Sequence, residues 1–271
     1  MKKLLTILAV MLSTNAFAWD QRAPLPPQAC QIHSPYGFAQ TAKPSLPICR
    51  EAYLVAYDAP AKIPVYVAYT LQPQNALGCF PRTNAFVADA SLGGTGARPD
   101  DYAGTGYDKG HAAPDGDLSW TQQVEYESFL MTNMYPQHGS LNRGIWKLLE
   151  TSIRGWAVQR NQPFTIYVGA YYGTGNEKIG NGVVVPHGYY KIVTNNATGE
   201  VAGWQFPHKK PYGNLGNDLT VFRAPLAQIQ EYAGVKYHFP QNAKELQPGK
   251  EWPVDYGMLT NAKRAKCKTN D

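Results

Sequence analysis

The sequence predicts an α+β protein with a largely antiparallel central sheet flanked by helices. The alternating run Val65-Tyr66-Val67-Ala68-Tyr69 is typical of a strand. After Asn142, apolar residues recur every four positions, as they do along one face of a helix. The predicted strands and helices are mixed without the regular βαβ alternation of a parallel sheet, and no internal repeat is present.

The first eighteen residues are expected to be a removable signal peptide. Lys2 and Lys3 form a positive start, residues 4–12 are almost purely apolar, and Ala16-Phe17-Ala18 is a cleavage signature. The apolar run is shorter than the roughly 20 residues that span a bilayer. The alternative is an uncleaved anchor or a buried N-terminal helix. We therefore expect an exported chain, periplasmic or extracellular, that begins at Trp19 and has no membrane-spanning segment.

The four cysteines, Cys30, Cys49, Cys79 and Cys267, fit export. They form no C-x-x-C pair, which argues against a zinc site or a thioredoxin-like motif. An even number of cysteines in an exported chain predicts two disulfides, and three pairings are open. We favour Cys30–Cys49, which closes a short loop, with Cys79–Cys267, which ties down the C-terminal tail. Four reduced thiols would better suit a cytosolic protein.

Size and charge allow one domain over residues 19–271, with no linker dividing it. The net charge is +5, and Lys2 and Lys3 account for two of these charges, so the exported chain carries +3. This mild excess permits a polyanionic partner without indicating one. The basic tail at 263–268 is typical of a solvated surface, and contact with a nucleic-acid backbone is the alternative.

The elements of the N-terminal part are expected to be short. Residues 19–81 should be loop-rich, because ten of the 21 prolines lie between Pro24 and Pro81. Strands are predicted at 52–57 and 65–71. Gly93-Gly94-Thr95-Gly96 indicates a flexible connection. It is not a phosphate-binding loop, because such a loop lies between a strand and a helix and ends in a lysine, and that pattern is missing here.

The later elements follow from caps and periodicity. Ser119-Trp120-Thr121-Gln122 predicts a capping box that begins a short helix. A longer helix is predicted from Asn142 to about Gln159. Strands are predicted at 164–171, 183–194 and 201–206, the last two joined by a turn at 195–199.

The segment Tyr107–Pro114 carries the first candidate for chemistry, His111. A histidine with a pKa near 6.5 can take a proton from water at neutral pH. Asp108 lies three residues upstream, and Gly110 lets the backbone bend where a side chain enters a cleft. A lone histidine is more often structural, but these neighbours favour a catalytic role.

The predicted long helix carries the second set of candidates. Asn142 lies near its N-cap, where asparagine is favoured for its amide oxygen alone. The same oxygen suits Mg²⁺, which prefers hard oxygen ligands and keeps several waters. Glu150 follows about two turns later and Arg154 one turn beyond. A surface Glu150–Arg154 pair needs no function, but beside an ion Glu150 could orient bound water and Arg154 could hold a phosphate.

Three ordered blocks resemble the DNA/RNA non-specific endonuclease family. They are residues 107–114, 129–137 and 141–150, and a weaker fourth block lies at 82–89. Together they cover a motif core of about 82–154. Each block alone is a weak signal, whereas three blocks in order and at close to the usual spacing are specific.

The resemblance implies a ββα-metal site. Asn142 would be the direct protein ligand of Mg²⁺, for which Mn²⁺ could substitute, and Glu150 would contact the ion through water. His111 would be the general base that acts on the attacking water. Arg82 and Arg154 would neutralise charge around the scissile phosphate. Asn133 would support the site by hydrogen bonding, and Asp108 would brace the strand that carries the histidine.

Lys109 departs from the family pattern, in which arginine is usual. The charge survives, but the planar fork of donors does not.

The activity implied by the resemblance is one-metal hydrolysis of DNA and RNA phosphodiester bonds, leaving 5′-phosphate ends. Because the backbone reacts, little sequence or sugar preference is expected. One alternative is a metal-dependent phosphodiesterase for small substrates, with Asp115 and Asp117 as another metal site, although Asp-Gly is typical of a turn. The other alternative is an exported nucleic-acid-binding protein that has lost catalysis. The presence of His111, Asn142, Glu150 and Arg154 together argues against it.

Overall fold

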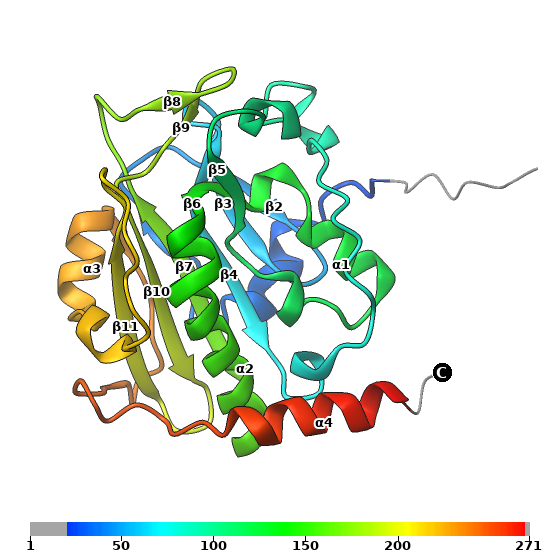
Figure 1. The fold of residues 1–271 in the computed structure, drawn as a ribbon, viewed down its shortest axis with the longest axis vertical. Coiled ribbons are helices and arrows are strands. Elements are labelled where there is room, and N and C mark those ends of the chain that lie inside the picture. The colour runs from blue at the N-terminus through cyan, green and yellow to red at the C-terminus, as the bar shows by residue number, and fades with distance from the viewer. Residues whose placement is uncertain (1–20, 269–271) are drawn as a thin grey trace, which may run out of the picture.

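A seven-stranded sheet forms the centre of the molecule in the computed structural model, which describes residues 21–268 (Figure 1). The expected signal peptide and its cleavage site lie outside the described residues. Neighbouring strands are antiparallel, except that β13 lies parallel to β11. In spatial order the strands are β13 (Lys244–Glu245), β11 (Glu200–Pro207), β10 (Gly188–Asn195), β7 (Phe164–Tyr171), β4 (Ile63–Leu71), β3 (Leu54–Asp58) and β2 (Leu46–Cys49). The predicted α+β class with a largely antiparallel sheet is confirmed.

Three two-stranded sheets and the helices surround this centre. The small sheets pair β1 (Gln40–Thr41) with β12 (Val235–Lys236), β5 (Tyr107–His111) with β6 (Met134–His138), and β8 (Lys178–Ile179) with β9 (Val183–Val184). The α-helices are α1 (Gln122–Ser128), α2 (Lys147–Arg160), α3 (Leu226–Ala233) and α4 (Tyr256–Lys268).

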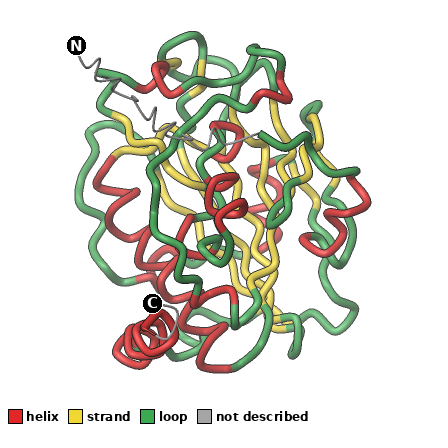
Figure 2. Tube along the Cα trace, turned by 90° about the vertical axis from the view of Figure 1, so that its right-hand side faces the viewer, coloured by secondary structure: helices red, strands yellow, loops and turns green. Residues whose placement is uncertain are grey.

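The central sheet is covered on both faces, as Figure 2 shows by the helical segments on either side of the strands. Successive side chains of a strand point to opposite faces. In β4, Val67 and Tyr69 therefore join the core beneath α2, while Tyr66 and Ala68 join the core beneath α3. With both faces covered, every residue of the central strand β7 is buried.

Several predicted elements agree with the structure. The strand predicted at 164–171 is β7, with the same bounds. The strands predicted at 52–57 and 65–71 correspond to β3 and β4, although β4 begins two residues earlier. The turn after β10 is also present, because the amide of Gly199 donates to the carbonyl of Asn195 at 2.9 Å.

The predicted helix from Asn142 to Gln159 is wrong at its start. Helix α2 begins at Lys147, and residues 141–146 form a separate wide turn before it. The two are divided at Gly144, whose φ of −101° and ψ of −117° are not helical. Asn142 is therefore not the N-cap of α2, and its amide serves another contact.

Two further details of the predicted elements are corrected. The cap of α1 is Thr121, whose hydroxyl accepts from the amide of Val124 at 3.2 Å, and not Ser119. The strand predicted at 183–194 is interrupted at Pro186, since proline has no N–H to donate to a sheet. Residues 183–184 pair with β8, and β10 begins at Gly188.

Both disulfides form in the favoured pairing. Cys30 bonds Cys49, and Cys79 bonds Cys267, with Cα–Cα distances of 5.6 Å and 5.3 Å. The second disulfide joins residues 188 positions apart and fastens α4 along the lower edge of the molecule (Figure 1). Among the described residues, no helix has both the length and the apolar composition needed to cross a bilayer.

Candidate active site

The β5–β6 ribbon presents His111 at the end of β5. His111 lies opposite Met134 in the antiparallel register, and Gly110 lies opposite Tyr135. Gly110 is required by space and not by a bend, because a Cβ there would collide with the side chain of Gln137. The ribbon therefore brings Gln137 directly over the backbone that precedes the histidine.

His111 is held in a buried, aromatic environment. Only 8% of the residue is exposed, and its ring lies edge-on to Phe129, with centroids 4.9 Å apart. Burial, together with the positive charges of Arg82 and Lys191, lowers the pKa of His111 to about 3. The imidazole is thus neutral at pH 7. Among the described residues, its Nε2 has no hydrogen-bond partner and is shielded from solvent.

Asn133 fixes the chain that leaves the histidine. Its Oδ1 accepts from the amide of Ala113 at 3.0 Å, and its Nδ2 donates to the carbonyls of Ala113 and Ser128, each at 2.8 Å. The side chain is fully buried. These bonds determine the path of residues 112–114 and so the position of His111, which is a supporting arrangement and not direct chemistry.

Asp108 joins β5 to the wide turn at residues 141–146. Its Oδ2 accepts from Nδ2 of Asn142 at 2.9 Å, and its Oδ1 forms an ion pair with Arg143 at 3.2 Å. Because the amide nitrogen of Asn142 makes this bond, the amide oxygen is the atom that could meet a cation. Asp108 therefore orients the asparagine.

Glu150, in the first turn of α2, faces a fully buried lysine. Nζ of Lys191 lies 3.5 Å from Glu150 Oε1, donates to the carbonyl of Ala112 at 3.2 Å, and sits 4.3 Å from the centre of the Trp146 ring. Burial raises the pKa of Glu150 to about 7, against the lowering effect of Lys191 and Arg154. Lys191 therefore links α2 to the residue that directly follows His111.

Arg154 is paired with Asp117 and not with Glu150. Its Nη1 lies 2.7 Å from Asp117 Oδ1, and Asp117 Oδ2 also accepts from the hydroxyl of Tyr69 at 2.8 Å. Gly116 allows this approach, because a Cβ there would lie 2.9 Å from Nη1. The helical Glu150–Arg154 pair considered from the sequence is thus replaced by two separate ion pairs.

Arg82 and Lys109 both lie over aromatic rings near the histidine. Arg82 forms an ion pair with Asp115, and its guanidinium lies 4.9 Å from the centre of the Phe129 ring. Nζ of Lys109 lies 5.0 Å from the centre of the Phe86 ring. Phe86 and Phe129 also pack against His111. A point charge over a ring does not need the planar fork of arginine, which accounts for a lysine at this position.

The donors around the site fit a hard cation held by few protein ligands. Among residues 21–268, no group of three or more His, Cys, Asp or Glu side chains could hold a metal ion. Asp115 and Asp117 are each engaged by an arginine and do not form a second site. An amide oxygen at Asn142, with water filling the remaining positions, suits Mg²⁺, which keeps several of its waters.

Sequence reasoning missed Lys191 and the role of Asp117. A signal for Lys191 was present, since a charged residue in the apolar strand Gly188–Asn195 requires a buried partner. No sequence feature pointed to the role of Asp117, because Asp115-Gly116-Asp117 looks like an ordinary turn. Cavity size does not reveal the site either, since a 690 Å³ cavity lies elsewhere, lined by residues that include Phe206, Arg223 and Tyr232.

Two antiparallel strands followed by a helix, bearing a buried histidine, an oriented asparagine and a glutamate, define a ββα site. Residues 32–245 match the model of the DNA/RNA non-specific endonuclease family. The chain belongs to that family.

Relatives agree with this assignment. A nuclease of Nostoc sp. is 32% identical over 220 residues, covering 76% of this chain and 77% of that protein. The mitochondrial nuclease 1 of Schizosaccharomyces pombe is 29% identical over 206 residues, and the match spans 68% of this chain and 63% of the yeast protein. Human mitochondrial endonuclease G is 28% identical over 204 residues, or 69% of this chain and 68% of that protein.

A solved structure shares the fold. A chain of the EndoG/EndoGI complex superposes with a TM-score of 0.67 at 24% sequence identity, covering 80% of this chain and 93% of that chain. Helix α4 lies beyond the family match, which ends at residue 245.

Proposed function

We propose that this protein is an exported, metal-dependent nuclease that hydrolyses phosphodiester bonds of DNA and RNA and leaves 5′-phosphate ends. The observation that carries the proposal is the state of His111. Its imidazole is neutral at pH 7, and Asp108, on the same strand, orients the amide of Asn142. A general base must be neutral before it takes a proton from water.

His111 would take the proton from the attacking water. In the free protein the cations Arg82 and Lys191 oppose a charge on the ring and hold its pKa low. A bound phosphodiester brings negative charge to the same place, and a neighbouring negative charge raises a histidine pKa. Substrate binding thereby makes His111 a stronger base at the moment it is needed.

Asn142 and Glu150 would provide the cation site. Asp108 orients the amide of Asn142, and Lys191 holds the carboxylate of Glu150 in place. When bound, Mg²⁺ or Mn²⁺ would act as a Lewis acid that stabilises negative charge on the phosphate. The low pKa of His111 also keeps a second positive charge away from the cation.

Arg82 and Arg154 would neutralise charge at the phosphate. Each is anchored by a carboxylate, Asp115 for Arg82 and Asp117 for Arg154. Anchored guanidiniums lose less freedom when they bind a phosphate than free ones do. Together with the cation site they favour an anion beside His111.

Substrate range, export and domain organisation belong to the same proposal. All of the groups named above would act on the backbone, which DNA and RNA share, so both polymers are expected as substrates. The expected signal peptide and the two disulfides support a periplasmic or extracellular location. A single unit over residues 19–271 is supported by the central sheet, which joins strands on both sides of the motif core at 82–154.

Cleavage of purified polymers tests the proposal. The mature protein would be incubated with supercoiled plasmid, with RNA and with a small phosphodiester such as bis(4-nitrophenyl) phosphate, each with Mg²⁺ or with EDTA. We expect both polymers to be degraded with Mg²⁺ and preserved with EDTA. Polymers that stay intact with Mg²⁺ would contradict the proposal, and cleavage of the small ester alone would identify a small-substrate phosphodiesterase.

A further inference from the structure

Helix α4 is a basic element outside the family match. Its thirteen residues contain no acidic side chain. They carry four cations, which are Lys263, Arg264, Lys266 and Lys268. Lys263, Arg264 and Lys268 are exposed, whereas Lys266 donates to the carbonyl of Gln74 at 2.6 Å. A basic tail is typical of a solvated surface, so its position relative to the site decides whether it has a role.

Helix α4 is fastened beside the candidate site. The Cys79–Cys267 disulfide ties its last turn to a residue three positions before Arg82. At its other end, the hydroxyl of Tyr256 lies 2.9 Å from Oγ of Ser152 on α2. A helix fixed at both ends holds its side chains at a constant distance from α2.

A cavity lies where α4 meets α2. It has a volume of about 330 Å³, and Arg154, Lys263 and Arg264 line it with Ala76, Leu259 and Thr260. Arg154 is therefore shared between the candidate site and this cavity. The lining residues include three cations and no carboxylate.

The charges in this cavity favour an anion. Although Lys263 is exposed overall, the protein around its side chain in the cavity partly desolvates it, and this, followed by the positive charge of Arg154, lowers its pKa, which the carboxylates of Asp115 and Asp117 only partly oppose. Both carboxylates are already paired with the arginines of the site. An anion that enters between the cations would relieve their mutual repulsion.

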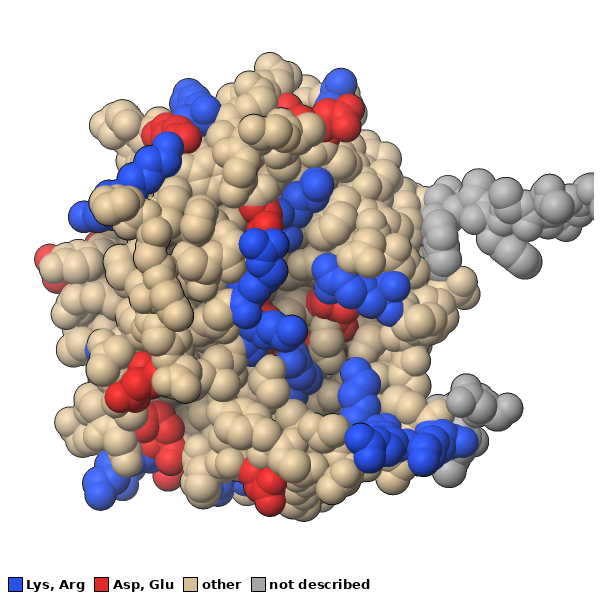
Figure 3. All heavy atoms as spheres, viewed as in Figure 1, with Lys and Arg blue, Asp and Glu red and all other residues tan. Residues whose placement is uncertain are grey.

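The basic side chains also form a track on the surface. Figure 3 shows Lys and Arg side chains in a band down the middle of one face, over the region of β5, β6 and α2, and again along α4. Regularly spaced backbone charges of a nucleic acid match a track of this kind, whereas a single small substrate would need only the site itself.

We propose that α4 is a second contact for the nucleic-acid backbone, in which Lys263 and Arg264, with Arg154, bind a phosphate next to the scissile one. The proposal rests on the proposed nuclease function and names an additional part of its substrate site. The Cys79–Cys267 disulfide keeps this contact in register with His111.

Binding measured without catalysis tests the proposal. Fluorescence anisotropy would report the Kd for a labelled DNA duplex in EDTA at several salt concentrations. Lys263→Ala/Arg264→Ala would be compared with Lys236→Ala/Lys250→Ala, which removes the same charge from exposed positions outside the cavity. For the α4 variant we expect Kd to rise about tenfold at low salt and the slope of log K against log salt to fall by about 2.

Further variants make the result specific. The swap Lys263→Arg/Arg264→Lys keeps both charges and should bind within about twofold of the wild type, as should the Lys236/Lys250 control. Equal Kd and equal salt slope for the α4 variant and the control would overturn the proposal. If the wild type degrades plasmid but the α4 variant binds normally, only the α4 contact fails. If the wild type degrades no polymer, the nuclease function itself fails.

Discussion

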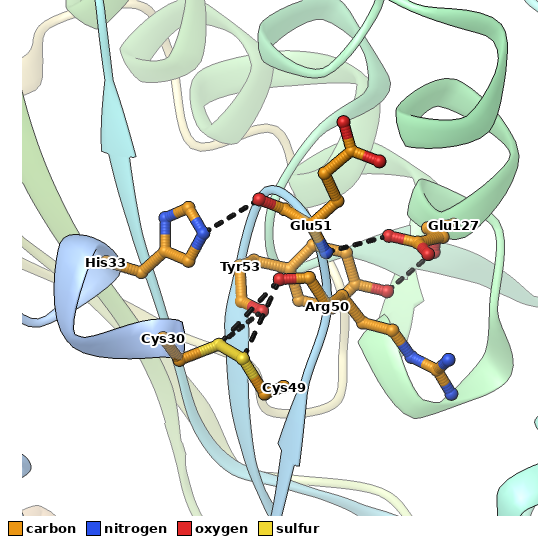
Figure 4. The surroundings of a disulfide bond; sticks show 7 residues. All are labelled: Cys30, His33, Cys49, Arg50, Glu51, Tyr53 and Glu127. Atoms are coloured by element: carbon orange, nitrogen blue, oxygen red, sulfur yellow. Dashed lines mark hydrogen bonds between the residues drawn. A yellow bond between two sulfur atoms is a disulfide. The ribbon is translucent and has the colours of Figure 1, made fainter. Parts of the chain in front are cut away.

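Two buried charged clusters, Arg50–Asp89 and Glu150–Lys191, differ in how fully the carboxylate is hydrogen-bonded. The Arg50–Asp89 cluster adjoins the Cys30–Cys49 disulfide, whose surroundings Figure 4 shows. Both oxygens of Asp89 accept from Arg50 Nη2 at 2.7 Å, and Thr132 and Ser91 donate to the same carboxylate. The bonds from these neighbours outweigh burial and lower the pKa of Asp89.

The Glu150–Lys191 cluster leaves its carboxylate poorly satisfied. Among the described residues, the ion pair of Glu150 is the 3.5 Å contact with Lys191, and burial raises the pKa of Glu150 to about 7. A hydrogen-bonded buried carboxylate stabilises the fold, whereas a carboxylate short of partners is free to accept a ligand at some cost in stability. We therefore expect the first cluster to stabilise the fold and propose that the second takes part in the chemistry.

Two of the histidines, His33 and His111, are both buried. Burial lowers the pKa of both, to about 4 for His33 and about 3 for His111. Nε2 of His33 lies 3.0 Å from the carbonyl of Glu51 (Figure 4), but its Nδ1, like Nε2 of His111, is buried without a partner among the described residues. Neither burial of a histidine nor an unpaired ring nitrogen therefore indicates catalysis by itself, and the sequence motif that joins His111 to Asn142 and Glu150 is the more informative feature.

The largest change in activity is expected from Asn142→Ala. Loss of the direct cation ligand should lower the cleavage rate at limiting Mg²⁺ about 10³-fold, because Lewis-acid stabilisation contributes several kcal/mol. The free energy of unfolding should change little, since among the described residues Asn142 makes one side-chain bond, to Asp108. Initial rates of plasmid cleavage across a Mg²⁺ titration would measure the effect. Asn214→Ala, on an exposed loop, is the matched control.

The largest change in stability is expected from Asp89→Asn. Removing one partner of a buried ion pair should cost about 3–5 kcal/mol in the free energy of unfolding, because Arg50 keeps an uncompensated charge. Urea denaturation would give the value. The cleavage rate per folded molecule should stay within about twofold of the wild type, and a selective loss of activity would contradict the division between the two clusters.

Much of the fold and the site could be predicted from the sequence, because periodicity and motif spacing are local. His111, Asn142, Glu150 and Arg154 were all predicted as site residues in this way. Their partners were not, because a pairing such as Lys191 with Glu150 arises only when β10 passes beneath α2. The start of α2 was also misplaced, since the helical repeat continues through Gly144 although its backbone does not.

A smaller loss of activity is expected from Glu150→Gln. The substitution keeps the shape but removes the charge, and loss of such a supporting group typically lowers activity 10- to 100-fold. Stability should fall by less than for Asp89→Asn, because the buried Lys191 loses its ion pair but burial already disfavours the charged form of Glu150. Single-turnover cleavage and urea denaturation of the same preparation would test both parts. A marked loss of stability would place Glu150 with Asp89 as a structural residue.

The smallest effect is a pH dependence of stability from the buried histidines. The pKa of His33 lies near 4 when folded, against 6.5 for an unperturbed histidine. The folded state therefore binds fewer protons, and this contribution is complete above pH 6.5 and is lost as the pH falls toward 4. His33→Gln should flatten the decline by up to about 1.4 kcal/mol per pH unit. Denaturation midpoints of the wild type and His33→Gln would be measured across this pH range. Equal slopes of midpoint against pH for the two proteins would show that His33 is protonated in the folded protein and would contradict the prediction.

The most direct test of the central claim compares His111→Ala with His33→Ala at equal concentrations of folded protein. Both substitutions remove a buried histidine, but only His111 lies in the proposed site. The initial rate of Mg²⁺-dependent plasmid cleavage should fall about 10²- to 10⁴-fold for His111→Ala, as expected for loss of a general base, and stay close to the wild-type rate for His33→Ala. Equal rates for the two variants would contradict the assignment of the chemistry to the β5–β6 ribbon and α2.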